Sequence, residues 1–154
     1  MATSARGVKQ AGGGAYAAGL RVLACMLGLF FIFNAIDKIA WITDSSILAG
    51  RLRGWLEHAA PSARWYIETV AMPGVPFFAR MVPVVELLAG AALVLGFWTR
   101  LAAAVVLLTV VNVHAARGFI FDPGFLIDGT GFPVLGGLLA LAIGGSRLPL
   151  SLSR

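Results

Sequence analysis

The sequence predicts an all-α fold, a four-helix transmembrane bundle with short amphipathic helices in the first outer loop. Of its 154 residues, 59% are hydrophobic and only 12% are charged, whereas soluble domains carry about 25% charged residues. There are four long apolar stretches, at residues 19–36, 81–98, 101–116 and 132–145. A membrane-spanning helix needs about 20 mainly apolar residues. Four such stretches leave too little polar sequence to coat a soluble fold, so we expect a multi-pass protein in a lipid bilayer.

The first helix is expected over about residues 16–42, ending at the polar run TDSS. In the following segment, apolar residues recur at helical spacing and form one stripe: Leu48, Leu52, Trp55 and Leu56. The expected solvent-facing side carries the polar residues Arg51, Arg53, Glu57 and His58. Pro61 suits the first turn of a second short helix. This pair of helices is expected to lie in the membrane interface or to cap the bundle.

The second and third spans are joined by a short link at residues 97–100 (FWTR), which makes them antiparallel neighbours. A loop rich in glycine, aspartate and aromatic residues, 117–131, precedes the fourth helix. We therefore expect three parts: a disordered cytoplasmic tail over residues 1–14, a membrane domain over 15–148 and a C-terminal tail over 149–154.

The formal net charge of +5 is spread over helix ends and loops. Because no basic stripe of the kind that binds nucleic acid is present, no nucleic-acid partner is expected. Four spans place both termini on the same side, and the positive residues near the first span favour a cytoplasmic location for both. Cys25 is the only cysteine, which excludes an intrachain disulfide.

Glu86 is the only charged residue in the apolar stretch 81–98. A charged side chain at the centre of a membrane helix costs about 2.5–3.5 kcal/mol on insertion scales. Such residues usually face protein or water, pair with another group and mark a functional site. Glu86 is therefore the first candidate site residue.

The first span offers the expected partner for Glu86. Four of its residues follow the spacing i, i+3, i+4 and i+7, which is one helix face: Asn34, Asp37, Lys38 and Trp41. Counted at 1.5 Å per residue, Lys38 and Glu86 both lie roughly 6–8 Å inside the outer end of their helices. On the third span, we expect Asn112 to point inward and His114 to face the rim of the site or a loop.

Two interpretations of this polar layer remain open. In one, Lys38 and Glu86 form a structural ion pair, which is weak evidence for stability because desolvation can exceed the attraction. In the other, they line a small polar pocket in the outer leaflet that binds a ligand head group or moves protons. A quinone head suits such a pocket, with apolar walls and a few donors and acceptors. The histidines lack metal-site spacing, so no metal is expected.

Two motifs resemble the DoxX/DoxD family of small four-helix membrane proteins. The first is GLFFIFNAIDK at residues 28–38, a Gly-Leu-Phe-like run that ends in lysine. The second is VELLAGAALVLGFWTR at residues 85–100, with a glutamate, a glycine four residues later and a final Thr-Arg. The resemblance carries over Lys38 and Glu86 as functional residues. It also carries over structural motif residues: Gly90, Gly96, Thr99 and Arg100. Gly90 lies one turn from Glu86 and is expected to let a neighbouring backbone come close.

The resemblance implies a bacterial inner-membrane protein that takes part in redox reactions. DoxD-type members are subunits of a thiosulfate:quinone oxidoreductase, and DoxX-type members associate with sulfur-transfer and oxidative-stress proteins. Such a subunit would bind a quinone without a covalent link. It has no redox centre of its own, so electrons would come from a partner protein or a dissolved donor.

For this function, Glu86 and Lys38 are the expected catalytic residues: Glu86 exchanges protons, and Lys38 holds it charged or donates to a quinone oxygen. The expected ligand-binding residues are Asn34, Asp37, Trp41, Asn112 and His114. The alternative is a non-catalytic accessory or scaffold subunit that stabilises a larger membrane complex. It would dock through the segment 47–72 and the loop 117–131.

Overall fold

The computed structural model describes residues 2–118, 127, 129, 131–146 and 148–152, with side chains from Gly14 onward. The predicted all-α fold is confirmed: every regular element in these residues is helical. Three segments are long and apolar enough to cross a membrane, namely Gly14–Asp37 of helix α1 and the whole of α4 and α5, and α7 is a shorter apolar helix. The elements are α1 (Ala2–Asp37), η1 (Ile39–Ile42), α2 (Ser46–Leu56), α3 (Pro61–Tyr66), η2 (Ile67–Ala71), α4 (Val75–Leu95), α5 (Thr99–Arg117) and α7 (Phe132–Gly144).

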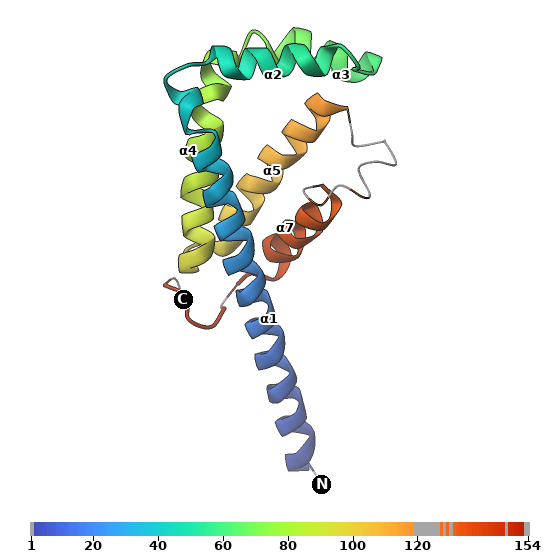
Figure 1. Ribbon diagram of the computed structural model, residues 1–154. Helices are drawn as coiled ribbons and strands as arrows, with labels where there is room; N and C mark the ends of the chain where they lie inside the picture. The colour runs from blue at the N-terminus through green and yellow to red at the C-terminus, as the bar shows by residue number, and fades with distance from the viewer. Residues whose placement is uncertain (1, 119–126, 128, 130, 147, 153–154) are drawn as a thin grey trace.

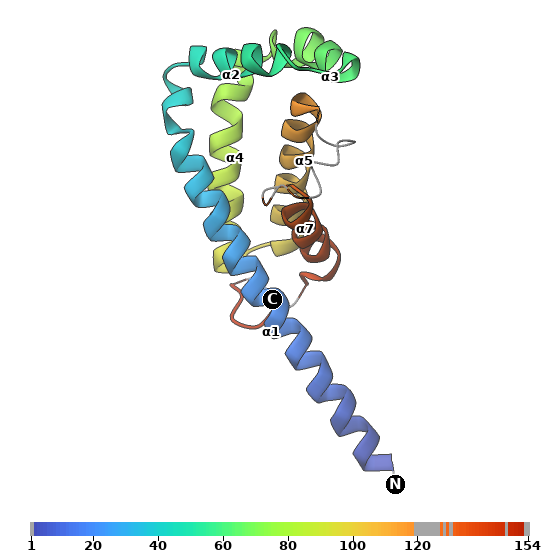
Figure 2. The same ribbon diagram turned by 45° about the vertical axis from the view of Figure 1, so that its right-hand side comes forward.

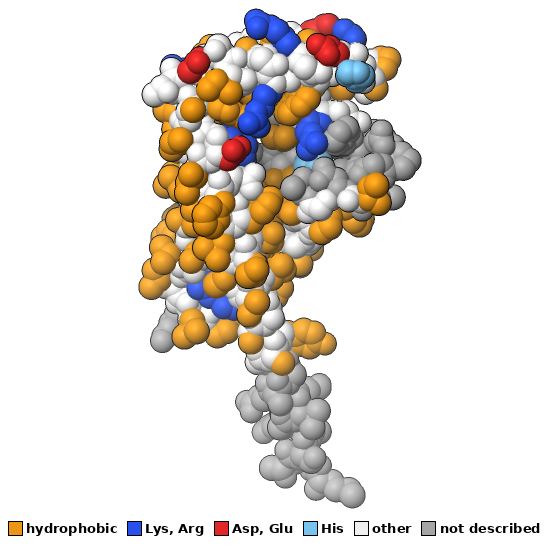
Figure 3. Space-filling model, in the orientation of Figure 1, with side chains coloured by type: hydrophobic (Ala, Val, Ile, Leu, Met, Phe, Trp, Pro, Cys, Tyr) orange, Lys and Arg blue, Asp and Glu red, His pale blue; other side chains and the backbone are white. Residues whose placement is uncertain are grey.

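The long helices form a bundle that α2 and α3 cover at one end (Figures 1 and 2). Helix α1 runs beside α4, and α7 packs against α5 and α1. The N-terminal part of α1 extends beyond the bundle at the opposite end (Figure 1). On the face shown in Figure 3, hydrophobic side chains cover much of the bundle, and charged side chains gather over α2 and α3. The predicted cap of short amphipathic helices is therefore present; we call this the capped end.

Helix α1 ends at Asp37 rather than at the expected Ile42. The backbone N–H of Lys38 donates to Ala35 O at 3.1 Å, which tightens the last turn, and a 3₁₀ helix follows over Ile39–Ile42. Trp41 therefore lies in a 3₁₀ turn rather than on the expected α-helical face, although it still lines one cavity with Asn34 and Lys38. The disordered tail over residues 1–14 and the other predicted domain limits stay predictions.

Helix α4 begins at Val75, before the apolar stretch that predicts it. Pro76 lies in its first turn, a position where a missing N–H costs little and the fixed φ of proline suits a helix. Gly96 ends the helix with φ +69°, a left-handed conformation that favours glycine. The short link to α5 and the antiparallel arrangement of α4 and α5 are as predicted.

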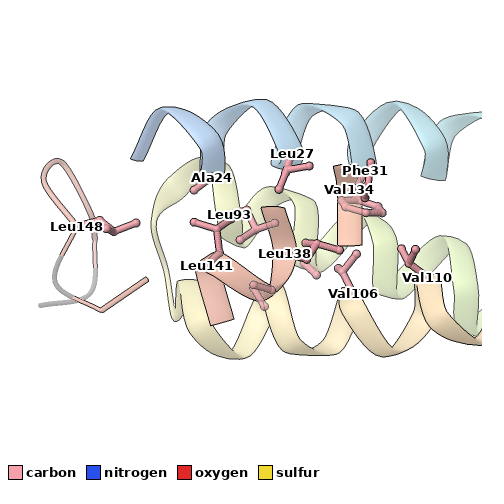
Figure 4. Close-up of a cluster of buried hydrophobic side chains, with 13 residues drawn as sticks. Ala24, Leu27, Phe31, Leu93, Val106, Val110, Val134, Leu138, Leu141 and Leu148 are labelled. Atoms are coloured by element: carbon pink, nitrogen blue, oxygen red, sulfur yellow. The ribbon is translucent and has the colours of Figure 1, made fainter. Parts of the chain in front are cut away.

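The main core lies where α1, α4, α5 and α7 meet (Figure 4). Its fully buried members include Ala24, Phe31, Leu93, Val106, Leu138 and Leu141. A second buried cluster fills the space under α2: Trp41, Leu48, Leu52, Ile67, Ala71, Val75, Ala79 and Ala116. The first cluster joins α1 to α4, and the second holds α2 against η1 and the start of α4.

Helices α1 and α4 approach each other at two glycines. A Cβ added to Gly28 would lie 2.7 Å from Gly90 O, and one added to Gly90 would lie 2.8 Å from Gly28 O. The prediction that Gly90 admits a neighbouring backbone is therefore confirmed. Small residues at such crossings allow close helix packing in membranes, and here they bring Lys38 within reach of Glu86.

Two arginines donate hydrogen bonds to the last carbonyl groups of helices, at the end of the bundle opposite the capped end. Arg21 Nη1 on α1 donates to Leu93 O at 2.9 Å, and its Nη2 donates to Val94 O in the last turn of α4. Arg100 Nε donates to Ala142 O at 2.9 Å near the end of α7. Because the last carbonyls of a helix lack intrahelical partners, both arginines act as C-terminal caps. This gives Arg100, a residue of the second motif, a structural role.

Replacing Arg21 by glutamine is expected to lower the free energy of unfolding by about 1 kcal/mol, since its bonds to two terminal carbonyls are lost. Reversible unfolding in mixed detergent micelles measures the change. Arg53→Gln, at an exposed position of α2, is the control and should leave the free energy unchanged. Equal values for the two variants would contradict a capping role for Arg21.

Candidate functional site

The site is built around a buried ion pair between α4 and the end of α1. Lys38 Nζ lies 2.8 Å from Glu86 Oε2 and 3.1 Å from Oε1. The side chains are 12% and 6% exposed. The predicted pairing of these two residues across neighbouring helices is thus present in the structure. Because Lys38 follows the last residue of α1, its positive charge also lies at the negative end of that helix.

Asn34 completes the environment of the ammonium group. Lys38 Nζ donates to Asn34 O at 3.2 Å and lies 3.3 Å from Asn34 Oδ1. The amide Nδ2 of Asn34 donates to Phe30 O at 2.9 Å, which leaves Oδ1 directed to Lys38. An ammonium group has three donors and a carboxylate about four acceptor positions. Lys38 is therefore fully engaged, whereas Glu86 keeps acceptor capacity beyond its bonds to Lys38.

Glu86 and Lys38 line a cavity of about 400 Å³ between the bundle and α2. Its walls come from α1, α4 and α5, and α2 forms the roof. Most of the lining is apolar or aromatic, including Phe30, Phe31, Trp41, Trp55, Phe78 and Val110. Figure 3 shows the molecule from the side that is hollowed beneath the capped end. The arrangement places an ionic pair on the wall of an otherwise apolar cavity.

On the α5 side of the cavity, the positions of Asn112 and His114 differ from the prediction. His114 is buried at 3% exposure, and its Nδ1 donates to Val110 O at 2.8 Å, whereas Asn112 is exposed. Asn112 Nδ2 donates to the hydroxyl of Tyr66 on α3. The prediction of an inward Asn112 and a rim His114 is therefore wrong, although both residues line the cavity. The α5 register is set by the packing of Val106 and Val110 in the core.

Asp37 lies outside the cavity, on the surface at the end of α1. Its Oδ2 is 3.7 Å from a terminal nitrogen of Arg51 on α2, and its side chain is 68% exposed. Arg51 also lies over the Trp41 ring, with its guanidinium carbon 5.0 Å from the ring centroid. The structure therefore brings six of the seven expected site residues to one cavity and joins the seventh, Asp37, to it through Arg51.

Sequence reasoning missed the contribution of α2. Arg51 was assigned to the solvent-facing side, but it lines the cavity together with Leu48, Leu52 and Trp55. The signal was available, because Leu48, Arg51 and Trp55 follow the spacing i, i+3 and i+7 of one helix face. A charged residue within an apolar stripe is easily assigned to solvent when nothing is known of the surface that the helix covers.

The loop expected over residues 117–131 lies largely outside the described residues, since 119–126, 128 and 130 are not among them. Its predicted docking role stays a prediction.

The long apolar helices and the buried ionic pair define a helical integral membrane protein with a cavity near one end of its bundle. The chain belongs to the DoxX family, whose model matches residues 19–116. The match covers α4 and α5 up to Ala116, and it includes every lining residue named above. No curated protein and no solved structure matches the chain.

Proposed function

We propose that this protein is a membrane subunit of a quinone-linked oxidoreductase and that a quinone head group binds, without a covalent link, beside Lys38 and Glu86. The observation that carries the proposal is the ionic pair on the wall of an apolar, aromatic cavity of about 400 Å³. Ligand pockets in proteins typically have about 300–1,000 Å³ and a few polar groups among apolar walls. The cavity therefore fits a ring-shaped head group with oxygen substituents.

Each polar residue has a distinct role in this proposal. A bound quinone takes up two electrons and two protons to become a quinol. Glu86 accepts or releases a proton at a carboxylate oxygen, using the acceptor capacity that Lys38 does not fill. Lys38 holds that carboxylate in place and balances its charge, and Asn34 fixes Lys38 through two oxygens. Asn112 and His114 face the same cavity from α5 and orient the head group.

The remaining parts of the proposal concern the surroundings of the protein. Electrons come from a partner protein or a dissolved donor. The chain lies in the bacterial inner membrane with both termini in the cytoplasm, which places the capped end on the outer side. The large apolar surface that the bundle presents (Figure 3) supports a bilayer location.

Quinone binding and donor-dependent quinone reduction, measured on the protein in lipid nanodiscs with its native membrane partners, test the proposal. Glu86→Gln keeps the shape of the side chain but cannot carry a negative charge. We expect it to reduce quinone turnover at least about a hundredfold, the lower end of the range that general acid–base groups contribute. The double variant Lys38→Met/Glu86→Gln removes both charges together and should be equally inactive.

An unchanged rate in both variants would overturn the proposal. The ion pair would then serve only to hold α1 against α4, and stoichiometric capture of the protein in a larger membrane complex would favour an accessory subunit. Glu57→Gln, at an exposed residue outside the cavity, is the matched control for the loss of a carboxylate.

A further inference from the structure

Trp41 is the large aromatic residue of the cavity that is tied most directly to the ion pair. It is 5% exposed and lines the cavity. Its backbone N–H donates to Lys38 O at 2.9 Å within the short turn that follows α1. The ring and the ammonium group that binds Glu86 are therefore carried by the same few residues, so their relative placement is fixed by this turn.

Arg51 contacts that ring from the roof of the cavity. Its guanidinium carbon lies 5.0 Å from the centroid of Trp41, inside the range of about 6 Å for a cation–π contact. A terminal nitrogen of the same guanidinium lies 3.7 Å from Asp37 Oδ2. Arg51 thus covers one face of the Trp41 ring while Asp37, at the end of α1, holds the guanidinium in place.

This cluster contributes little to the stability of the fold. The side chains of Arg51 and Asp37 are 47% and 68% exposed, and ion pairs between such exposed side chains contribute little to stability. Trp41 belongs to the same buried cluster as Leu48 and Leu52. The burial of the ring therefore does not depend on its contact with Arg51.

We infer that Arg51 is a positioning residue that sets the plane of Trp41 and thereby makes the cavity selective for flat, fused ring systems. The inference rests on the proposed function, since it concerns which quinone class the site prefers. Aromatic rings attract one another in defined stacked or edge-to-face geometries, and larger rings bury more area. A two-ring naphthoquinone therefore gains more from a correctly oriented Trp41 than a one-ring benzoquinone does.

The test compares the affinities of two probes, a short-tailed naphthoquinone and a short-tailed benzoquinone, for the full-length protein in lipid nanodiscs. Arg51→Gln is expected to weaken naphthoquinone binding about fivefold and benzoquinone binding less than about twofold, as the loss of an orienting cation–π contact implies. Asp37→Asn should shift the ratio of affinities in the same direction. Arg51→Lys keeps a positive charge for the ring and should retain most of the wild-type ratio of naphthoquinone affinity to benzoquinone affinity.

Two further measurements distinguish positioning by Arg51 from a purely structural role: the thermal stability of the variant and the affinities of a control variant on the same helix. The thermal midpoint of Arg51→Gln should change by about 2 °C or less. Arg53→Gln, an exposed α2 residue that does not line the cavity, should leave the ratio unchanged. An unchanged ratio in both Arg51→Gln and Asp37→Asn overturns this inference alone. Wild-type protein that binds neither probe overturns the proposed function instead.

Discussion

Replacing Lys38 by methionine, with Glu86 retained, is expected to lower the free energy of unfolding by about 3–5 kcal/mol. The substitution leaves a 6% exposed carboxylate without its partner. An unpaired buried charge is costly because neither water nor a counter-charge compensates for it. Equilibrium unfolding in mixed micelles, followed by circular dichroism while the denaturing detergent is increased, measures the difference from wild type.

The double variant Lys38→Met/Glu86→Gln is the decisive control for this result. Removing both charges together is often nearly neutral for stability, so it should recover most of the loss. If Lys38→Met is as stable as wild type, the pair contributes nothing to the fold. If the double variant is no more stable than Lys38→Met, the loss comes from the lysine side chain itself rather than from an unpaired carboxylate.

Replacing Gly28 by leucine is expected to produce the second large loss, of about 3 kcal/mol, at the high end of the usual cost of overpacking. Already its Cβ would lie 2.7 Å from Gly90 O and 2.9 Å from Val94 N. Since both atoms belong to the backbone of α4, no side-chain rotation relieves the contact, and α1 and α4 must separate. The same unfolding experiment measures the change.

Gly19→Leu is the matched control, because Gly19 lies on the same helix and an added Cβ would meet no atom within 4 Å. It should leave the free energy of unfolding unchanged or raise it slightly, since leucine is a better helix former than glycine. A similar loss in both variants would show that the close helix crossing is not the cause.

The sequence predicted the parts of the structure that depend on hydrophobicity and charge. The apolar stretches gave the long helices, and the lone charge of Glu86 led to Lys38, because a buried carboxylate needs a counter-charge at its own depth. Gly90, one turn from Glu86, indicated the close approach of the neighbouring helix. These features follow from the cost of placing polar groups in an apolar environment. That cost depends on the type of each residue, so it can be judged from the sequence.

The remaining features depend on tertiary contacts that no local pattern contains. Nothing between Leu29 and Ile42 signals that α1 stops at Asp37, since that segment contains neither proline nor glycine. Asn112 and His114 lie about 200° apart on a helix, so only the packing of α5 decides which is buried. Arg51 became part of the cavity because α2 folds over the bundle, and its charge alone suggested solvent.

The short length of α7 has a consequence for the surrounding bilayer. Its residues Phe132–Gly144 extend about 20 Å along the helix axis, whereas the hydrocarbon layer is about 30 Å thick. Lipids beside this helix must compress to match it, while those beside α1 and α4 need not. The protein is therefore expected to deform its membrane unevenly around its perimeter, with the thinnest lipid annulus on the α7 flank.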